Sequence, residues 1–311
     1  MRRQYDFSLN ADAQSLSPSA LNNYMDCSLR FYLHHIEKIK PPKELSDELD
    51  NSVLGRVFHK AVELIYREIG RVEQEQGKAF PAFVVSSEMI EGFLKISARI
   101  ERAIERAFDE EFFGNRAVPR SRYNGEQLVY FGVVKQFVRR LLEIDKTYAP
   151  FTIEALEQPV EQDIAINGMQ LRVGGIVDRI DSKAGVLRVV DYKTGGYPKE
   201  VSEMDKLFES GKDRANYIFQ AFLYSSILVK KQTQAVQPAL VYIQKATDTA
   251  DYSPAITWAK EPIQDFRELA EEFETALHKK LAEVFNPSIA FTQTENTKVC
   301  EYCDFREMCG R

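Results

Sequence analysis

Two aspartates and a lysine stand at the ends of two predicted neighbouring strands. Asp178 lies in GGIVDRID, and Asp191 and Lys193 lie in VVDYKTG. Residues two apart on a strand share a face, and Asp178 can converge on that face if the strands pair. Two carboxylates there form a hard oxygen site that suits Mg2+ or Mn2+. A lysine beside them can position an attacking water and offset charge in the transition state of phosphodiester hydrolysis.

An Asp-x-Lys triplet is common by itself and also fits a surface ion pair at the edge of a strand. Its surroundings favour chemistry, because the apolar run VLRVV precedes it and a glycine-rich turn follows it. Charged residues at the ends of buried strands are usually functional. The residues alone therefore favour a metal-dependent hydrolase and leave a structural ion pair open.

The four cysteines form a second group with metal-binding potential. Cys27 stands near the N-terminus, whereas Cys300, Cys303 and Cys309 fit C-x2-C-x5-C close to the C-terminus. Four thiolates can ligate a 4Fe–4S cluster or a tetrahedral Zn2+, and their spacing does not separate these metals; reduced thiols without a special role are the third interpretation. Ligation would close nearly the whole chain into one loop, which removes on the order of 5 kcal/mol of entropy from the unfolded state. We expect such a site to clamp the two ends of the chain, with Tyr302 and Phe305 shielding it.

Hydrophobic periodicity predicts helices first, then strands, then both. Period 3.6 indicates helices over 15–40, 52–70, 85–113, 125–146, 215–231 and 262–285, with a proline-led linker over 41–50. Period 2 and the Asn167-Gly168 turn predict a hairpin of strands 152–164 and 169–181, followed by the strands VLRVVDYK and PALVYIQKA. This order predicts an α/β fold, a central sheet flanked by helices. We expect one domain over 1–311: a mainly helical part over 15–150 with Cys27 and His59, the catalytic sheet over 151–245, and the C-terminal helix and cysteines over 246–311.

The composition fits a single globular domain. Of 311 residues, 44% are hydrophobic, which suffices for a packed core. The sequence contains no run of 18 apolar residues, so no membrane-spanning helix is predicted. The N-terminus lacks the apolar stretch of a secretory signal, and we therefore expect a cytoplasmic protein. The net charge of −6 argues only weakly against nucleic-acid binding, because phosphate contacts need a local basic surface and metal-binding carboxylates lower the net charge.

Four motifs follow one another along the chain: Gly55-x3-His59-x3-Glu63, GGIVDRID, VVDYKTG and Gln220-x3-Tyr224. Their order resembles that of the RecB-type nuclease domains of the PD-(D/E)XK superfamily. The resemblance implies a restriction-endonuclease-like core with a central mixed sheet. One departure is that Val177, and not proline, precedes the first aspartate.

The same resemblance assigns roles to residues that are ambiguous by themselves. It implies that the metal ligands are His59, Asp178, Asp191 and the backbone carbonyl of Tyr192. It implies that Lys193 is the catalytic lysine. It also implies that Gln220 and Tyr224 support the site and contact DNA. Without it, His59 fits a structural histidine on an apolar helix face, and Gln220 and Tyr224 fit the polar edge of a core helix. Glu63 fits a solvated helix position and stays outside the expected site.

The cysteine pattern resembles the iron–sulfur nucleases of that superfamily, which include the AddB nuclease domain and CRISPR-associated nucleases. This resemblance implies a 4Fe–4S cluster on Cys27, Cys300, Cys303 and Cys309, with structural Zn2+ as the alternative. We therefore expect a Mg2+- or Mn2+-dependent deoxyribonuclease, an exonuclease that acts on single-stranded or unwound DNA ends in recombination and repair. The chain has no G-x4-G-K-[ST] motif, so we expect no ATPase activity of its own. The resemblance implies a helicase domain or subunit as the partner. A catalytically idle DNA-binding module and a zinc-stapled protein-interaction domain are the alternatives.

Overall fold

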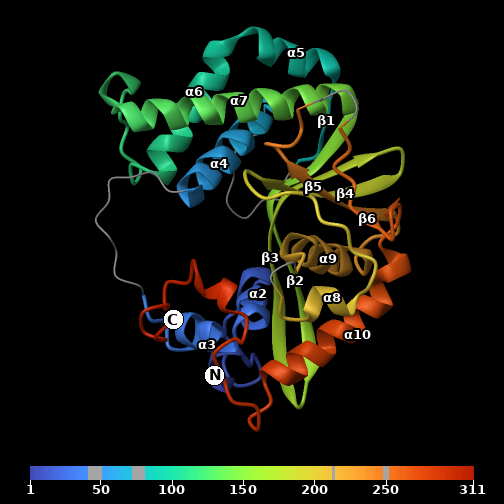
Figure 1. The fold of residues 1–311 in the computed structure, drawn as a ribbon. Coiled ribbons are helices and arrows are strands. Elements are labelled where there is room, and N and C mark those ends of the chain that lie inside the picture. Colours follow the sequence, from blue (N-terminus) through green and yellow to red (C-terminus); the bar gives the residue numbers. More distant parts are fainter. Residues whose placement is uncertain (41–50, 72–80, 212–213, 248–251) are drawn as a thin grey trace.

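A mixed five-stranded sheet forms the centre of the molecule (Figure 1). The computed structural model describes residues 1–40, 51–71, 81–211, 214–247 and 252–311. The strands follow one another across the sheet in chain order, β1 (Phe83–Val85), β2 (Phe151–Ile166), β3 (Met169–Lys183), β4 (Val186–Lys193) and β5 (Ala235–Tyr242). The first three pairings are antiparallel and β4–β5 is parallel.

The β2–β3 hairpin confirms the turn expected from the sequence. Ile166 pairs with Met169, and Asn167 and Gly168 both have positive φ angles, 50° and 75°. Positive φ at both central residues matches the right-handed twist of the strands, which is why Asn-Gly is favoured there. The continuous apolar run of β4 is buried on both faces, as expected for a strand that is covered by helices on each side.

Helices cover both faces of the sheet (Figure 1). The sheet therefore separates two hydrophobic cores, one on each face. One face packs against α2 (Pro18–Asp26), α8 (Asp205–Phe208), α9 (Asn216–Val229) and α10 (Arg267–Val284). The other face packs against α4 (Asn51–Gly70), α5 (Ser87–Lys95), α6 (Ser97–Glu111) and α7 (Gly125–Tyr148). The expected α/β fold, a central mixed sheet flanked by helices, is thus confirmed.

Shorter elements complete the described chain. They are α1 (Arg2–Tyr5), α3 (Ser28–Phe31), the π-helical turn Tyr32–Ile36, the 3-10 turns Arg120–Arg122 and Thr297–Cys300, and the two-stranded pair β6 (Thr257–Trp258) and β7 (Glu261–Pro262). None of the helices in the described ranges is long and apolar enough to span a membrane.

Three of the expected elements differ from the structure. The helix predicted over 15–40 is interrupted at Cys27, whose backbone is extended. The helix predicted over 85–113 follows a short strand, β1, and is split at Ile96. Period 3.6 over 215–231 is typical of an amphipathic helix with one apolar face. Helix α9 is instead buried almost all round, because it packs against both the sheet and α10. The linker expected over 41–50 lies outside the described residues.

The two ends of the chain pack side by side (Figure 1). The amide of Leu29 and the hydroxyl of Ser28 donate to the carbonyl of Thr292, over 3.0 Å and 3.1 Å, and the amide of Thr292 donates back to the Ser28 hydroxyl. Hydrogen bonds therefore join the segment that begins at Cys27 to the segment that leads to the other cysteines.

Candidate active site

Asp178 and Asp191 lie together where β3 and β4 stop pairing. The last register pair at this end is Arg179 with Val190, so the two aspartates follow it directly. Both are buried, and Oδ2 of Asp178 accepts a 2.7 Å hydrogen bond from the backbone N–H of Tyr192. The antiparallel pairing thus brings the two carboxylates together, as the strand pattern suggested.

Helix α9 supplies a glutamine that holds Asp191 and Lys193. Nε2 of Gln220 donates to Oδ1 of Asp191 over 2.9 Å, and Nζ of Lys193 donates to Oε1 of Gln220 over 3.1 Å. Nζ of Lys193 also forms an ion pair with Oδ2 of Asp191 at 2.5 Å. Burial alone would lower the pKa of Lys193, but the charges of Asp191 and Asp178 raise it, so this side chain stays cationic.

Tyr224 lies one helical turn beyond Gln220 and contacts it. The hydroxyl of Tyr224 is 3.4 Å from Nε2 of Gln220. It fits against β3 because position 175 is glycine, where a Cβ atom would lie only 2.8 Å from that hydroxyl. The structure thus brings Gln220 and Tyr224 to the site as supporting residues, and their contact with DNA stays a prediction.

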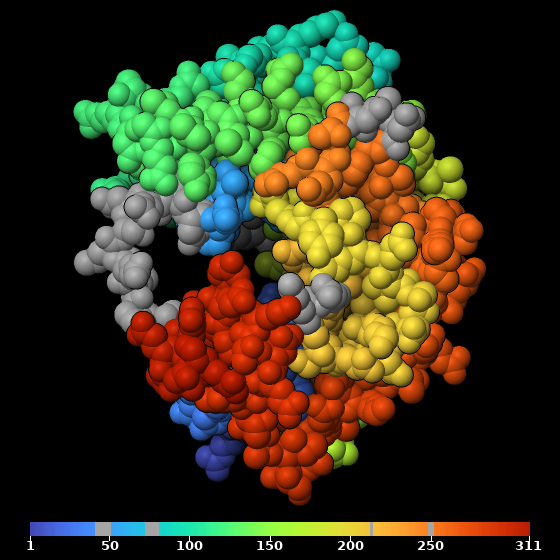
Figure 2. Space-filling view, viewed as in Figure 1, coloured from blue at the N-terminus to red at the C-terminus, as the bar shows by residue number. Residues whose placement is uncertain are grey.

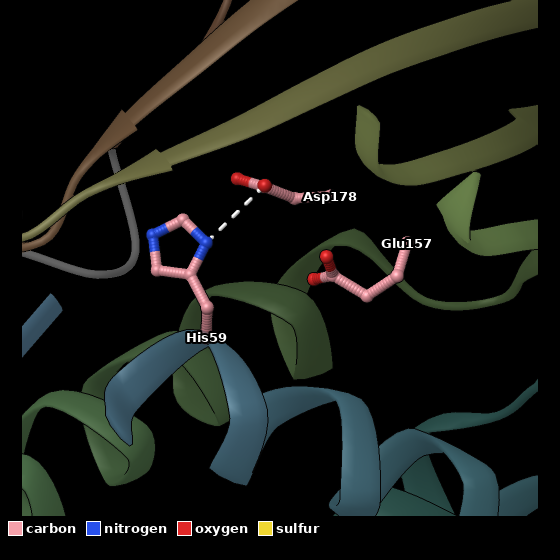
Figure 3. Close-up of side chains that lie close together, drawn as sticks. All are labelled: His59, Glu157 and Asp178. Atoms are coloured by element: carbon pink, nitrogen blue, oxygen red, sulfur yellow. Dashed lines mark ion pairs between the residues drawn. The ribbon is translucent and has the colours of Figure 1, made fainter. Parts of the chain in front are cut away.

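His59 approaches Asp178 from α4, and a further acidic residue joins them (Figure 3). Nδ1 of His59 is 3.2 Å from Oδ1 of Asp178. Glu157 on β2 points to the same place, and one ligand atom from each of the three residues lies within 4.8 Å of the others. Ligands bind a divalent ion at about 2.0–2.2 Å and so lie up to about 4.4 Å apart, which makes this group close to the required geometry.

Sequence reasoning missed Glu157, although the hairpin contained a signal for it. Leu156 pairs with Arg179 and Gln158 pairs with Val177, so Glu157 faces Asp178 when pairs are counted from the Asn167-Gly168 turn. Its φ angle of 48° is uncommon for a residue other than glycine. The register of the hairpin would have identified Glu157, whereas no motif does.

The electrostatics of these groups favour the binding of a divalent cation. Burial and the charge of Asp178 raise the pKa of Glu157 to about 8. Burial raises the pKa of Asp191 to about 6, with a further contribution from Asp178. Burial would lower the pKa of His59, but the charge and hydrogen bond of Asp178 raise it to about 9. The same pair keeps the pKa of Asp178 below its ordinary value against the effect of burial. Three carboxylates beside one histidine and one lysine are a donor set that a divalent ion would balance.

Without a metal, we expect the free energy of unfolding to fall as the pH rises from 6 to 9. His59 has a pKa of about 9 in the folded state and 6.5 in the unfolded state, and Glu157 has a pKa of about 8 in the folded state and 4.5 in the unfolded state. The folded state therefore holds these protons more tightly, and the stabilisation that they provide is lost as the pH rises through the folded-state pKa values. Denaturant unfolding at pH 6 and pH 9, in EDTA and in Mg2+, measures this. The fall should be steeper in EDTA than in Mg2+, and shallower in His59→Gln. Equal slopes with and without metal would contradict the expectation.

A buried charge network beneath the site ties the sheet to α7. Arg179 donates two hydrogen bonds to Asp145, of 2.6 Å and 3.0 Å, and is only 1% exposed. Arg179 and Arg188 both form ion pairs with Asp181. Because two arginines face two aspartates, the buried charges balance, and removing one partner would leave the others uncompensated. The network fixes the backbone of β3 next to Asp178.

Glu63 lies outside the group formed by His59 and Asp178. Its carboxylate forms ion pairs with Lys60 at 3.1 Å and Arg67 at 2.8 Å on the same helix. It is 6% exposed, so it is a buried ion-paired residue and not the solvated one that the sequence suggested. Its omission from the candidate site agrees with this geometry.

The four cysteines line one small cavity between the two chain ends. Burial and the proximity of Cys303, Cys27 and Cys300 raise the pKa of the Cys309 thiol. Phe305 is 3% exposed and also lines the cavity, as expected, but Tyr302 is 90% exposed and does not shield it. Among the described residues, one group of three ligand atoms lies within 4.8 Å, that of His59, Glu157 and Asp178, and it contains no cysteine.

A hollow opens on the face shown in Figure 2. Helix α4 in blue, the cysteine-bearing C-terminal segment in red and the segment that follows β4 in yellow border it. Two of these elements adjoin the site, since α4 carries His59 and the segment after β4 begins at Thr194, next to Lys193.

The sequence matches the family model of the PD-(D/E)XK nuclease superfamily over residues 15–310. No curated protein matches it significantly. Among solved structures, the crystal structure of SSO0001 is similar, with 12% sequence identity, 83% of this chain and 96% of that chain covered, and a TM-score of 0.27.

Proposed function

The chain belongs to the PD-(D/E)XK nuclease superfamily, and we propose that it hydrolyses phosphodiester bonds of DNA with Mg2+ or Mn2+. The observation that carries this proposal is the convergence of His59, Asp178 and Glu157 beside the bonded group of Asp191, Gln220 and Lys193. Membership in the superfamily supports the reaction class, and the donor set supports the metal.

Each residue has a distinct role in the proposed reaction. His59, Asp178, Asp191 and the Tyr192 carbonyl would hold the ion, and Glu157 adds a further carboxylate. A bound Mg2+ or Mn2+ lowers the pKa of a coordinated water and neutralises charge on the phosphate.

The cationic amine of Lys193 would stabilise the negative charge that develops on the phosphate oxygens in the transition state. Gln220 fixes the direction of that amine, since it bonds both Lys193 and Asp191. This arrangement limits the motion of the lysine before the substrate binds.

We further propose that the substrate is a single-stranded or unwound DNA end, cut as an exonuclease in recombination and repair beside a helicase domain or subunit. The order of the RecB-type motifs supports this class. The hollow bordered by α4 and the segment after β4 offers an approach for a flexible strand (Figure 2).

We propose a 4Fe–4S cluster on Cys27, Cys300, Cys303 and Cys309. The one small cavity that all four cysteines line supports a common site. The resemblance of their spacing to the iron–sulfur nucleases supports a cluster, in which thiolates bind the iron atoms. Its role would be structural, because the cysteines connect the two ends of the chain.

Titration of cleavage with Mn2+ tests the proposed function. We expect His59→Ala to need at least about tenfold more Mn2+ for half-maximal cleavage, because it loses an imidazole ligand that suits this ion. His278→Ala on α10 is the matched control and should titrate like the wild type. An unchanged titration for His59→Ala would show that His59 is a structural residue.

A further inference from the structure

A small aromatic pocket lies beside Lys193, at the start of α9. Its volume is about 150 Å3, and it is lined by Gly196, Tyr197, Lys199, Ala215, Asn216, Tyr217, Ile218 and Tyr242. Tyr242 is the register partner of Lys193 in the β4–β5 pairing, so the pocket is one strand spacing from that lysine.

Tyrosine rings and lysine amines are arranged around this pocket. The ring centroids of Tyr217 and Tyr242 lie 6.3 Å apart at an interplanar angle of 51°. Nζ of Lys193 is 4.5 Å from the centroid of Tyr217, and Nζ of Lys199 is 5.6 Å from that of Tyr197. Tyr197 is 55% exposed, so its ring is available to an incoming ligand. The site therefore joins flat apolar surfaces to cations that attract phosphate.

Gly196 keeps the pocket open. Its φ angle is +80°, which glycine adopts at little cost. A Cβ atom here would lie 3.0 Å from a ring carbon of Tyr217 and 3.6 Å from one of Tyr242. Any other residue would thus be strained and would also narrow the space between the rings.

We propose that this pocket binds one pyrimidine base of single-stranded DNA next to the cleaved phosphate, an inference that rests on the proposed function. A cavity of about 150 Å3 accommodates a benzene molecule, so this volume suits one six-membered ring. Bases stack on aromatic side chains whatever their sequence, but only when their faces are not covered by a duplex. The phosphate attached to such a base would lie toward Lys193. The pocket thereby selects an unpaired nucleotide.

Binding of a labelled (dT)12 strand in EDTA, followed by fluorescence anisotropy, tests the pocket without cleavage. Tyr197→Ala should weaken binding about 5- to 150-fold, the range for loss of one stacked base. Tyr197→Phe should stay within about twofold, because the ring remains. Tyr302→Ala, which removes the exposed tyrosine of the C-terminal segment, is the matched control.

The same strand with abasic nucleotides separates stacking from general attraction. The effect of Tyr197→Ala should vanish on it and on a duplex of the same sequence. Equal losses of affinity on normal and abasic strands, or no loss at all, would contradict base binding in this pocket. If the wild type cleaves DNA in Mg2+ but Tyr197→Ala binds like the wild type, only the base-binding proposal fails. If Tyr197→Ala loses affinity for the normal strand but the wild type cleaves no DNA, only the proposed function fails.

Discussion

Replacement of Lys193 by Met should lower the rate of DNA cleavage by about a hundred- to a thousandfold, the usual effect of removing one preorganised charge-stabilising group. Methionine keeps most of the aliphatic length and removes the ammonium group. The loss should appear in kcat, because the amine acts on charge that develops in the transition state. Single-turnover cleavage with saturating Mg2+ measures it.

Lys183→Met is the matched control for this change. Lys183 lies on β3 and pairs with Val186 at the end of the β3–β4 ladder opposite to the aspartates. This variant should cleave at nearly the wild-type rate, although it loses the hydrogen bond from Nζ to the carbonyl of Tyr148. A Lys193→Met protein that is folded and cleaves like the wild type would remove the lysine from the reaction.

Replacement of Cys27 by Ala should remove the iron and lower the melting temperature by roughly 10 °C. The proposed cluster would link Cys27 to Cys300, Cys303 and Cys309, and closing so long a loop would stabilise the folded state by on the order of 5 kcal/mol. Iron analysis, absorbance near 400 nm and thermal unfolding of anaerobically prepared protein measure the change.

Ser28→Ala separates the cysteine effect from that of the neighbouring hydrogen bonds. Ser28 bonds Thr292 across the same chain ends, so its loss should cost only about 1 kcal/mol and leave the iron content intact. Full iron content and unchanged stability in Cys27→Ala would disprove the clamp. Zinc in place of iron in the wild type would support the tetrahedral alternative.

Much of the sheet could be predicted because the turn residues and the hydrophobic periodicity of the segments beside them indicate the same strands. The Asn167-Gly168 turn, the period-2 segments around it and the apolar run before Asp191 define β2, β3 and β4. The break at Cys27 could not be predicted, because it results from tertiary contacts with Thr292. Strand β1 is only three residues long and carries too little periodic signal.

The residues of the site likewise fall into those that spacing along the chain predicts and those that it does not. Spacing on one strand placed Asp191 and Lys193 together, and helical spacing placed Gln220 near Tyr224. The contribution of Glu157 depends on the register between two strands, which a motif does not contain. The exposure of Tyr302 depends on how the C-terminal segment folds back, and sequence proximity to the cysteines did not determine it.

The most direct test of the central claim is cleavage of end-labelled single-stranded and duplex DNA by the wild-type protein, with and without Mg2+. The proposed site predicts cleavage of the single strand that requires the metal and that is lost in Asp191→Asn, a variant of nearly the same shape. Absence of cleavage by folded, iron-loaded protein on both substrates, or equal cleavage by Asp191→Asn, would contradict it.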